Sequence, residues 1–426
     1  MPPMRGAWVN TLKARGQACL RPRPALMLTF LILTLAFPLE DIMRERSVAR
    51  HGSPEGDFLV YYSAAKAARQ PGEHHLYADV IRDSQSSVWG VSSFNYPPFS
   101  AFLMEPLTIL PPTRAVMVWK YALVLMTALA VYFTLGASSK QPVSVAALAI
   151  GVAAAFSFHP HQYSMFLGQM GGLILLAWAL GLYLFSRGRP VSSAFCFAFG
   201  TVIKVAPIFV VPLLAIRRQW RCLGAYVGWV VALSGLSMWQ LGWQPYRDWL
   251  WAVYPVISHG TKAFQNRSLP GLILWCAPGQ VWGQRGTLGW EVKAPAIILS
   301  LAFYLWCWKK SRGSQGLVHE LALAPLLYLL TSPVAWTHHF ILALVPLVYL
   351  WMKSQDTRVE VSSSESAVLV AVTLVLGTAA PNYLAGGLNN SVLYTLVMGS
   401  WVLATLALIG VGMKMYARCL PDGANG

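Results

Sequence analysis

Residues Ala25 to Leu39 read ALMLTFLILTLAFPL, an apolar stretch without a charged side chain. A helix of this length crosses most of a bilayer. Similar stretches recur along the chain as far as Met413, and the sequence is 56% hydrophobic but only 11% charged. A soluble core cannot use so many apolar runs, so the sequence predicts an all-α, polytopic integral membrane protein.

Hydropathy divides the chain into about eleven or twelve candidate membrane segments. They run over residues 25–39, 95–110, 114–136, 142–158, 164–186, 191–216, 222–242, 291–308, 319–332, 337–352, 365–380 and 391–413. No soluble domain or fixed-period repeat interrupts them, so we expect residues 1–426 to form one membrane domain, with residues 351–426 as C-terminal membrane helices. A large loop follows the first segment, from Glu40 to Phe94, and a second loop lies near Trp243 to Trp282.

Basic residues indicate the orientation of the chain. Five of them precede the first segment, which we expect to remain as an uncleaved helix with a cytoplasmic N-terminus: Arg5, Lys13, Arg15, Arg21 and Arg23. A second cytoplasmic turn is indicated by Lys309, Lys310 and Arg312. The first loop, which carries eight of the sixteen acidic residues, is therefore predicted to face away from the cytoplasm.

Two features conflict with simple alternation of the segments. Arginines flank both ends of residues 191–216, and both ends cannot be cytoplasmic if this stretch crosses once. We therefore expect it to break at Lys204-Val205-Ala206-Pro207 into two half-spans, with Lys204 at the outer turn. Alternation also places His159 and His161 inside, unless another early segment is re-entrant; the sequence does not say which.

The bulk composition excludes several kinds of protein. The net charge of +16 invites a nucleic-acid partner, but Lys and Arg lie in short clusters between apolar runs, as topology signals do. We expect membrane lipids and no nucleic acid around the chain. The six cysteines are scattered and show no C-x-x-C spacing, so neither a disulfide framework nor a structural zinc is expected.

Several polar groups would meet at the outer surface under this topology. They are Asp57, the pair His159 and His161 with Gln169, Lys204, the pair Asn266 and Arg267, and the pair His338 and His339. Each also has a purely structural interpretation. Asp57 follows the first segment and could simply be the N-cap of a helix from Phe58 to Ala68, and a single histidine at a membrane interface is often an amphipathic anchor.

The cations and the paired histidines have alternatives too. Lys204 is unusual within an apolar stretch unless it pairs or lines a watery space, but it could snorkel to the interface. Arg267 could be a solvated loop residue. His338 and His339 point about 100° apart on a helix, so only one of them is expected to be chemical. Metal binding by the four histidines lacks any recognised ligand spacing, and we expect no metal.

Aromatic residues and prolines complete the pattern. Tyr96-Pro97-Pro98 predicts an extended entry into the second segment. Five tryptophans crowd the second loop: Trp243, Trp249, Trp251, Trp275 and Trp282. We expect a mixture of an interfacial aromatic belt and a surface that contacts sugar or lipid.

The ordered set of these motifs, over residues 25–350, resembles glycosyltransferase family 87 of the GT-C superfamily. The resemblance is carried by Asp57 with Tyr61-Tyr62, Leu76-Tyr77, Phe94-Asn95-Tyr96-Pro97-Pro98, Gly168-Gln169, Lys204-x-x-Pro207, the basic run Arg217 to Arg221, Asn266-x-Ser268 and Ser332-Pro333-x-x-Trp336-x-His338-His339. Gly171 and Ala335 stand where the family commonly has Asn and Ser. The family includes polyprenyl-phosphate-mannose-dependent mannosyltransferases.

The resemblance implies a GT-C membrane enzyme that passes a hexose, mannose in particular, from a polyprenyl-phosphate donor to a lipid or glycan hydroxyl, with inversion. It implies a site on the extracytoplasmic side of a bacterial inner membrane and no cofactor. Asp57 with His338 or His339 would be the acid/base residues. The donor phosphate and the rest of the substrate would be bound by Lys204, Arg267, Asn266, Gln169, His161, Tyr62 and Tyr96. The alternative is a polytopic transporter or lipid flippase, although no inverted repeat is visible.

Overall fold

The computed structural model describes residues 56–70, 75–78, 94–263, 265–277, 289–310, 313–356, 359, 361–378 and 391–418. The first apolar segment, most of the first loop and Trp282 lie outside these residues. The described chain contains no β-strand, only a single antiparallel bridge between Asn266 and Trp336. The all-α prediction is therefore confirmed.

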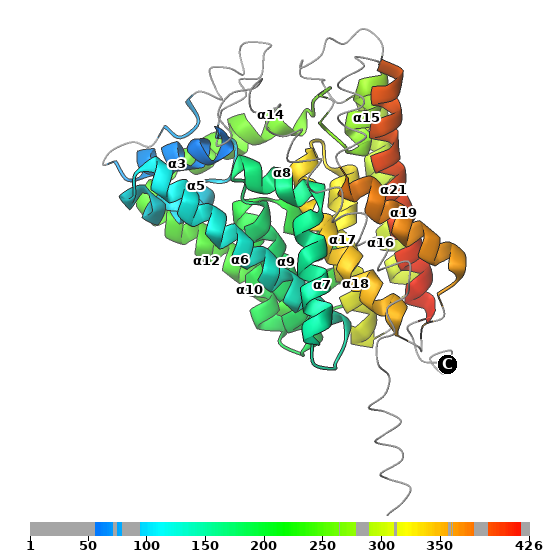
Figure 1. The fold of residues 1–426 in the computed structure, drawn as a ribbon. Helices are drawn as coiled ribbons and strands as arrows, with labels where there is room; N and C mark the ends of the chain where they lie inside the picture. Colours follow the sequence, from blue (N-terminus) through cyan, green and yellow to red (C-terminus); the bar gives the residue numbers. More distant parts are fainter. Residues whose placement is uncertain are drawn as a thin grey trace, which may run out of the picture.

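Figure 1 shows the order of the helices along the chain. The first group is α3 (Gly56–Ala68), α5 (Pro98–Met104), the 3₁₀ turn η1 (Glu105–Ile109), α6 (Pro112–Ser138), α7 (Val145–Ser157), α8 (His159–Leu167), α9 (Gly171–Ser186), α10 (Pro190–Ile203), the 3₁₀ turn η2 (Ala206–Val210), α11 (Val211–Ile216) and α12 (Trp220–Leu241). The second is α13 (Gln244–Asp248), the π-helical turn η3 (Trp249–Val253), α14 (Tyr254–Ser258), α15 (Leu269–Cys276), α16 (Trp290–Lys309), α17 (Gly313–Thr331), the 3₁₀ turn η4 (Thr337–Ala343), α18 (Leu344–Gln355), α19 (Ser363–Gly377) and α21 (Ser391–Arg418).

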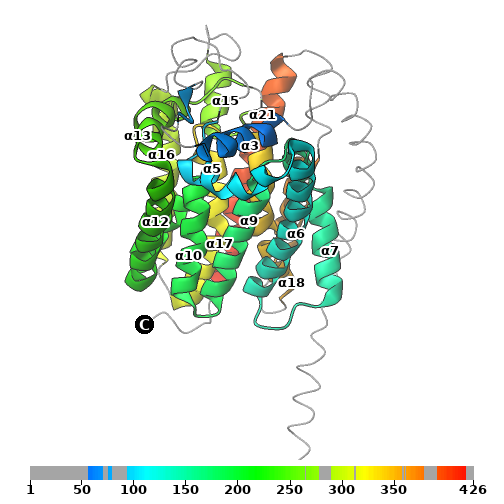
Figure 2. The same cartoon turned by 90° about the vertical axis from the view of Figure 1, so that its left-hand side faces the viewer.

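A bundle of long apolar helices forms the body of the protein (Figure 2). Within the described chain, α6, α12, α16 and α21 are each long and apolar enough to cross a membrane, and shorter apolar helices such as α9 and α17 lie among them. The centre is well packed: Trp178 of α9 is fully buried, and its indole nitrogen donates to the Leu321 carbonyl of α17 at 3.0 Å. This architecture is that of a polytopic membrane protein.

The segment predicted over residues 95–110 does not cross the bundle, so that prediction is wrong. Tyr96-Pro97-Pro98 gives the extended entry expected, but α5 is short and the 3₁₀ turn η1 follows from Glu105. The Tyr62 hydroxyl then donates to the Leu110 carbonyl at 2.9 Å, which ties the end of this segment back to α3. The segment leaves and returns at one end of the bundle, as a re-entrant segment would; if the α8 histidines face outward, it is the early re-entrant segment that the alternation calls for.

The second re-entrant segment is residues 191–216, as predicted. Helix α10 ends at Ile203, the chain reverses at Lys204, and η2 and α11 run back beside it. The Cys222 thiol donates to the Pro190 carbonyl at 3.3 Å, so the start of α10 and the start of α12 lie together. With 14 residues, α10 is only about 21 Å long. It is therefore a half-span, because the hydrocarbon core is about 30 Å thick.

The two re-entrant segments place the basic turns at one end of the bundle, called here the basic end. It carries Lys140, Arg187, Arg189, Arg217, Arg218, Arg221, Lys309 and Lys310. The Arg187 guanidinium donates to the Gly136 carbonyl of α6 at 3.2 Å, which links two of these turns. The opposite end, the site end, carries α3 and α5 (Figures 1 and 2) and also α8 (Figure 1).

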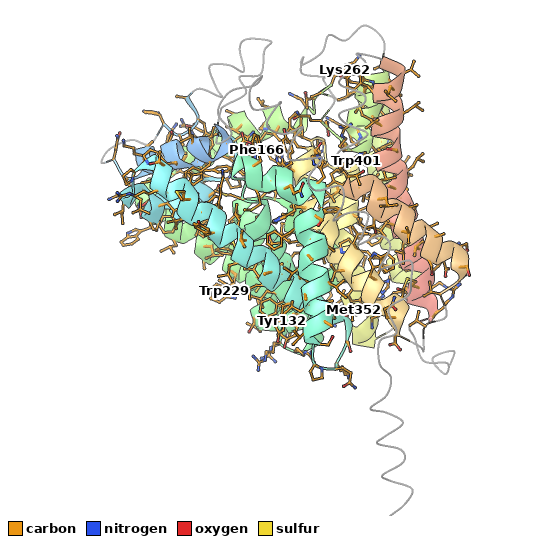
Figure 3. The ribbon with its side chains drawn as sticks, viewed as in Figure 1. Tyr132, Phe166, Trp229, Lys262, Met352 and Trp401 are labelled. Carbon is orange, nitrogen blue, oxygen red and sulfur yellow. The ribbon has the colours of Figure 1, made fainter. Side chains whose placement is uncertain are left out.

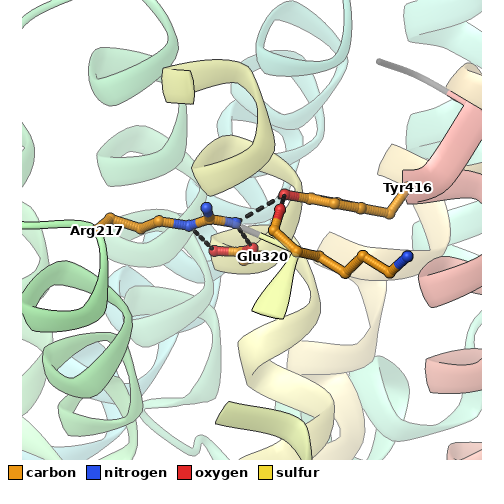
Figure 4. Close-up of polar contacts among 4 residues, drawn as sticks. Arg217, Glu320 and Tyr416 are labelled. Atoms are coloured by element: carbon orange, nitrogen blue, oxygen red, sulfur yellow. Dashed lines mark hydrogen bonds and ion pairs between the residues drawn. The ribbon is translucent and has the colours of Figure 1, made fainter. Parts of the chain in front are cut away.

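A buried ion pair ties the basic end together (Figure 4). The Arg217 guanidinium donates two hydrogen bonds to the Glu320 carboxylate and a third, of 2.7 Å, to the Tyr416 hydroxyl. Tyr416 in turn donates to the Lys310 carbonyl at 2.9 Å. The side chains of Arg217 and Glu320 are only 3% and 0% exposed. This clamp joins the returning arm of the re-entrant hairpin to α16, α17 and α21.

Glu320→Leu is expected to lower the free energy of unfolding by about 3–5 kcal/mol, because it leaves the buried Arg217 charge without its partner. The double variant with Arg217→Met should recover much of that loss, since both charges are then gone. Thermal unfolding in detergent measures both effects. Asp248→Asn is the control: its partner Arg247 is 55% exposed, so this change should cost at most about 1 kcal/mol. Equal losses in all three variants would contradict the assigned role of the clamp.

Candidate active site

Gln169 is the centre of a hydrogen-bond network at the site end. Its amide nitrogen donates to Oδ2 of Asp57 at 2.5 Å, and its amide oxygen accepts from the hydroxyls of Tyr61 at 2.5 Å and Tyr96 at 3.0 Å. Three separate parts of the chain therefore meet at one amide. The network holds the Asp57 carboxylate in one orientation. Its second oxygen, Oδ1, takes no part in the hydrogen bond from Gln169.

Local backbone geometry explains why these parts can meet. Gly168 ends α8 with φ of +66°, a left-handed conformation that favours glycine. A Cβ atom at this position would lie 2.7 Å from Cβ of Phe58, so only glycine lets α3 approach so closely. The Trp119 indole nitrogen donates to the Gly168 carbonyl at 2.9 Å. The turn thus aims Gln169 at the first turn of α3, where Asp57 is the second helical residue and not the N-cap.

Lys204 supplies the positive charge of the site. It lies at the break after α10, and its ammonium nitrogen is 5.3 Å from the centre of the Tyr96 ring. Burial raises the pKa of Asp57 above its usual value, while the hydrogen bond from Gln169 and the charge of Lys204 both oppose that rise. The ammonium group is therefore directed to the Asp57 network, not to the basic end.

The structure distinguishes the two adjacent histidines of η4. Nδ1 of His339 accepts from the Trp336 amide at 3.2 Å, and its ring also bonds the Val334 backbone. His338 is buried as well, but its Nε2 has no hydrogen-bond partner in the described chain. The two rings are nearly perpendicular, with centres 4.5 Å apart. His338 is therefore the one with a nitrogen available to a ligand, and His339 holds the turn.

Asn266 fixes the loop that precedes α15. Its side-chain oxygen accepts from the Ala335 amide and the Ser268 hydroxyl, both at 2.9 Å, and its nitrogen donates to the carbonyls of Pro333 and Thr261. These internal bonds use its hydrogen-bonding capacity, so Asn266 positions the loop; the substrate contact expected of it stays a prediction.

Arg267 is 1% exposed, so the alternative of a solvated loop residue is wrong. Its backbone nitrogen donates to the Ala335 carbonyl at 2.8 Å, and its guanidinium lies 5.6 Å from the Trp401 ring. Burial lowers its pKa to about 9, which leaves it charged at neutral pH. Arg267 also interacts electrostatically with Tyr163 and His159 of α8.

The histidines of α8 face different neighbours. His159 stacks on Tyr163 with ring centres 6.0 Å apart, and Tyr163 lies 6.0 Å from His338. His161, two residues further along the helix, packs edge-on against Phe156 of α7. Burial lowers the pKa of His159 to about 3 and that of His161 to about 4, so both rings are neutral at neutral pH. Tyr163 thus connects the Arg267 region to His338, and His161 lies away from it.

The predicted site residues therefore fall into two sets. Those that converge are Asp57, Gln169, Tyr96, Lys204 and His338, with Arg267 joined through Tyr163. Those that bond or pack elsewhere are Tyr62, His161, Asn266 and His339. Sequence reasoning missed the part played by Tyr61, although its spacing of four residues from Asp57 places both on one helix face. It also missed Tyr163, four residues after His159, and Trp401, which no motif marks.

The four described tryptophans of the second loop divide into two bonded and two exposed side chains. Trp249 donates to the Asn95 carbonyl at 3.2 Å and Trp275 donates to the Thr395 hydroxyl at 3.0 Å, so both are structural. Trp243 and Trp251 are exposed. Their outward rings are typical of an interfacial belt; contact with sugar stays a prediction.

Comparison with known proteins gives a consistent result. The model of glycosyltransferase family 87 matches residues 94–333. A polyprenol-phosphate-mannose-dependent alpha-(1-2)-phosphatidylinositol pentamannoside mannosyltransferase of Mycolicibacterium smegmatis is 24% identical over 304 residues, which are 70% of this chain and 68% of the relative. The protein of the same description from Mycobacterium tuberculosis is 26% identical over 322 residues, 73% of this chain and 69% of the relative.

Gln169→Leu is expected to move the acid limb of the pH–rate profile to higher pH. A carboxylate that acts as a base is active when ionised, so the rate falls as pH drops through its pKa. The Gln169 hydrogen bond favours the ionised Asp57, and its loss should raise that pKa further. The dependence of kcat/KM on pH measures the shift.

Gln162→Leu is the matched control, because Gln162 donates to the Phe156 carbonyl and stands outside the network. It should leave the acid limb in place. An acid limb that is the same in wild type and Gln169→Leu would exclude Asp57 as the group that titrates.

Proposed function

Because the chain belongs to glycosyltransferase family 87, we propose that it transfers a mannosyl group from a polyprenyl-phosphate donor to a hydroxyl of a lipid or glycan acceptor. Family membership makes the chain a hexosyltransferase, which replaces the transporter or flippase alternative. The observation that carries the proposal is the convergence of Asp57, Lys204 and His338 at one end of the bundle. A carboxylate can remove the acceptor proton, a cation can stabilise the departing phosphate, and an open imidazole can bind the substrate.

Asp57 is the general base of the proposed reaction. Its carboxylate removes the proton of the acceptor hydroxyl as the oxygen attacks the anomeric carbon, an effect worth roughly 10²–10⁴ in rate. The bond from that carbon to the donor phosphate breaks, and polyprenyl phosphate leaves with the bonding electrons. A single displacement inverts the anomeric configuration. The donor already carries an activated sugar, so the proposed reaction uses no cofactor.

Lys204 and Arg267 stabilise the departing phosphate. Fixed cations in a site that excludes water act strongly on charge that develops in the transition state. Lys204 is half-buried beside Tyr96, and Arg267 is almost fully buried. His338 offers its Nε2 to the substrate between them, since the charge of Lys204 and the ring of Tyr163 both lie near it.

The site end is proposed to face away from the cytoplasm. The basic turns gather at the opposite end, and Lys and Arg are concentrated in cytoplasmic loops. This orientation places the reaction on the extracytoplasmic face of a bacterial inner membrane, where a lipid-linked donor would enter from the bilayer.

An impermeant thiol reagent should label Cys276 in intact cells, because Cys276 is exposed at the end of α15 on the site end, whereas Cys196, Cys222 and Cys307 are buried. The protein used should carry Ser at positions 19 and 419. In the same background with Cys276→Ser, a cysteine introduced by Lys140→Cys at the basic end should react only after permeabilisation. The reverse pattern would place the site in the cytoplasm.

Purified protein in liposomes should transfer mannose from polyprenyl-phosphate mannose, and not from a nucleotide sugar, to a mannoside acceptor. Asp57→Asn should abolish transfer, because the amide keeps the hydrogen bond to Gln169 possible but cannot accept the proton. Lys204→Met should raise the donor KM and slow turnover about tenfold or more. Product detection by mass spectrometry measures each rate.

The two histidines supply an internal control. His338→Ala should lower turnover and leave the melting temperature unchanged, whereas His339→Ala should lower the melting temperature because it opens the turn at Trp336. Near wild-type transfer by Asp57→Asn would remove the base from the mechanism. Transfer from nucleotide sugars alone would refute the proposed donor.

A further inference from the structure

The C-terminal helix α21 reaches the site end although it lies outside residues 94–333, which the family model matches. Trp401 is fully buried near the middle of this helix (Figure 3). Its ring lies between two parts of the site: the Arg267 guanidinium is 5.6 Å from the ring centre, and Phe340 of η4 packs edge-on at 4.8 Å. Phe340 directly follows His338 and His339.

The position of Trp401 is fixed at several points along α21. Thr395 accepts a hydrogen bond from Trp275 of α15, six residues before Trp401. Below it, Gly412 lies so close to α17 that a Cβ atom there would be 2.6 Å from Leu323, and Tyr416 belongs to the buried clamp with Arg217. Helix α21 therefore cannot slide, and it presents Trp401 to Arg267 in one register.

The indole nitrogen of Trp401 provides an independent observation. It is buried and has no hydrogen-bond partner within the described chain. A buried N–H group without a partner is costly, and tryptophan usually finds an acceptor when it is buried. The ring that carries this unused donor also lies against a buried guanidinium, and these two groups together are suited to an oxyanion.

We propose that Trp401 positions Arg267 for the donor phosphate and that its indole N–H donates to a phosphate oxygen. The proposal rests on the proposed function, because it assigns the anion to the lipid phosphate. Tryptophan is the aromatic side chain that best holds a cation over its face. The ring packs against the guanidinium from one side and so restricts its position when the site is empty.

Binding of farnesyl phosphate to the full-length protein in detergent tests this role, with farnesol as the uncharged probe. Wild type should bind farnesyl phosphate more tightly than farnesol. Trp401→Leu should weaken farnesyl phosphate binding roughly tenfold and leave farnesol unchanged. Trp401→Phe keeps a ring against Arg267 but lacks the N–H group, so its affinity for the phosphate should fall between the other two.

A double variant separates positioning from simple packing. Arg267→Met should itself remove the preference for farnesyl phosphate over farnesol. Adding Trp401→Leu should then cause no further loss of affinity for farnesyl phosphate, because the effects of substituting two coupled residues are not additive. Leu408→Ala, on the same buried face of α21, should lower the melting temperature and keep the preference.

The proposal is overturned if Trp401→Leu keeps wild-type affinity for farnesyl phosphate, if it weakens farnesol equally, or if wild type shows no preference. Additive losses in the double variant would overturn the action through Arg267. All of these tests measure binding or melting temperature, so none of them depends on catalytic turnover. A protein that shows the expected binding but no mannosyl transfer would refute the proposed function and retain the phosphate site.

Discussion

The reversal of the chain at Lys204 is the constraint on which the rest of the structure depends. A lysine inside an apolar stretch is expensive in a membrane unless it meets an anion, an aromatic face or water. Here α10 stops at Ile203, and Lys204 lies beside Tyr96 and near Asp57. The return arm then carries the chain back to Arg217, where the clamp with Glu320 and Tyr416 begins. One hairpin thus connects the candidate site at one end of the bundle with the ion pair at the other.

The candidate site is assembled from parts of the chain that are far apart in sequence, and local contacts hold each part in place. Gly168 allows the close approach of α8 and α3, and Asn266 pins its loop to the strand-like residues before η4. Helix α21 covers Arg267 with Trp401. Rigid support of this kind would serve the proposed transfer, because a base and a cation act best when they are placed before the substrate arrives.

Hydropathy located most of the helices within a few residues, because an apolar run of sufficient length has few alternatives in a bilayer. It failed at residues 95–110. That run contains apolar residues, but two prolines open it and Glu105-Pro106 interrupts it, so it cannot hold one long helix. The prediction succeeded at residues 191–216, which arginines flank. There the charge pattern contradicted a single crossing, and the re-entrant hairpin followed from the sequence.

The sequence by itself determined the membrane class, the break at Lys204, the family resemblance and the set of candidate site residues. Each of these depends on composition or on order along the chain. Only the tertiary structure decided between neighbours: Tyr61 over Tyr62 for the Asp57 network, and His338 over His339 for an available nitrogen. The reason is physical. Adjacent residues on a helix or turn share almost the same local sequence, and they differ only in the distant groups that their side chains meet.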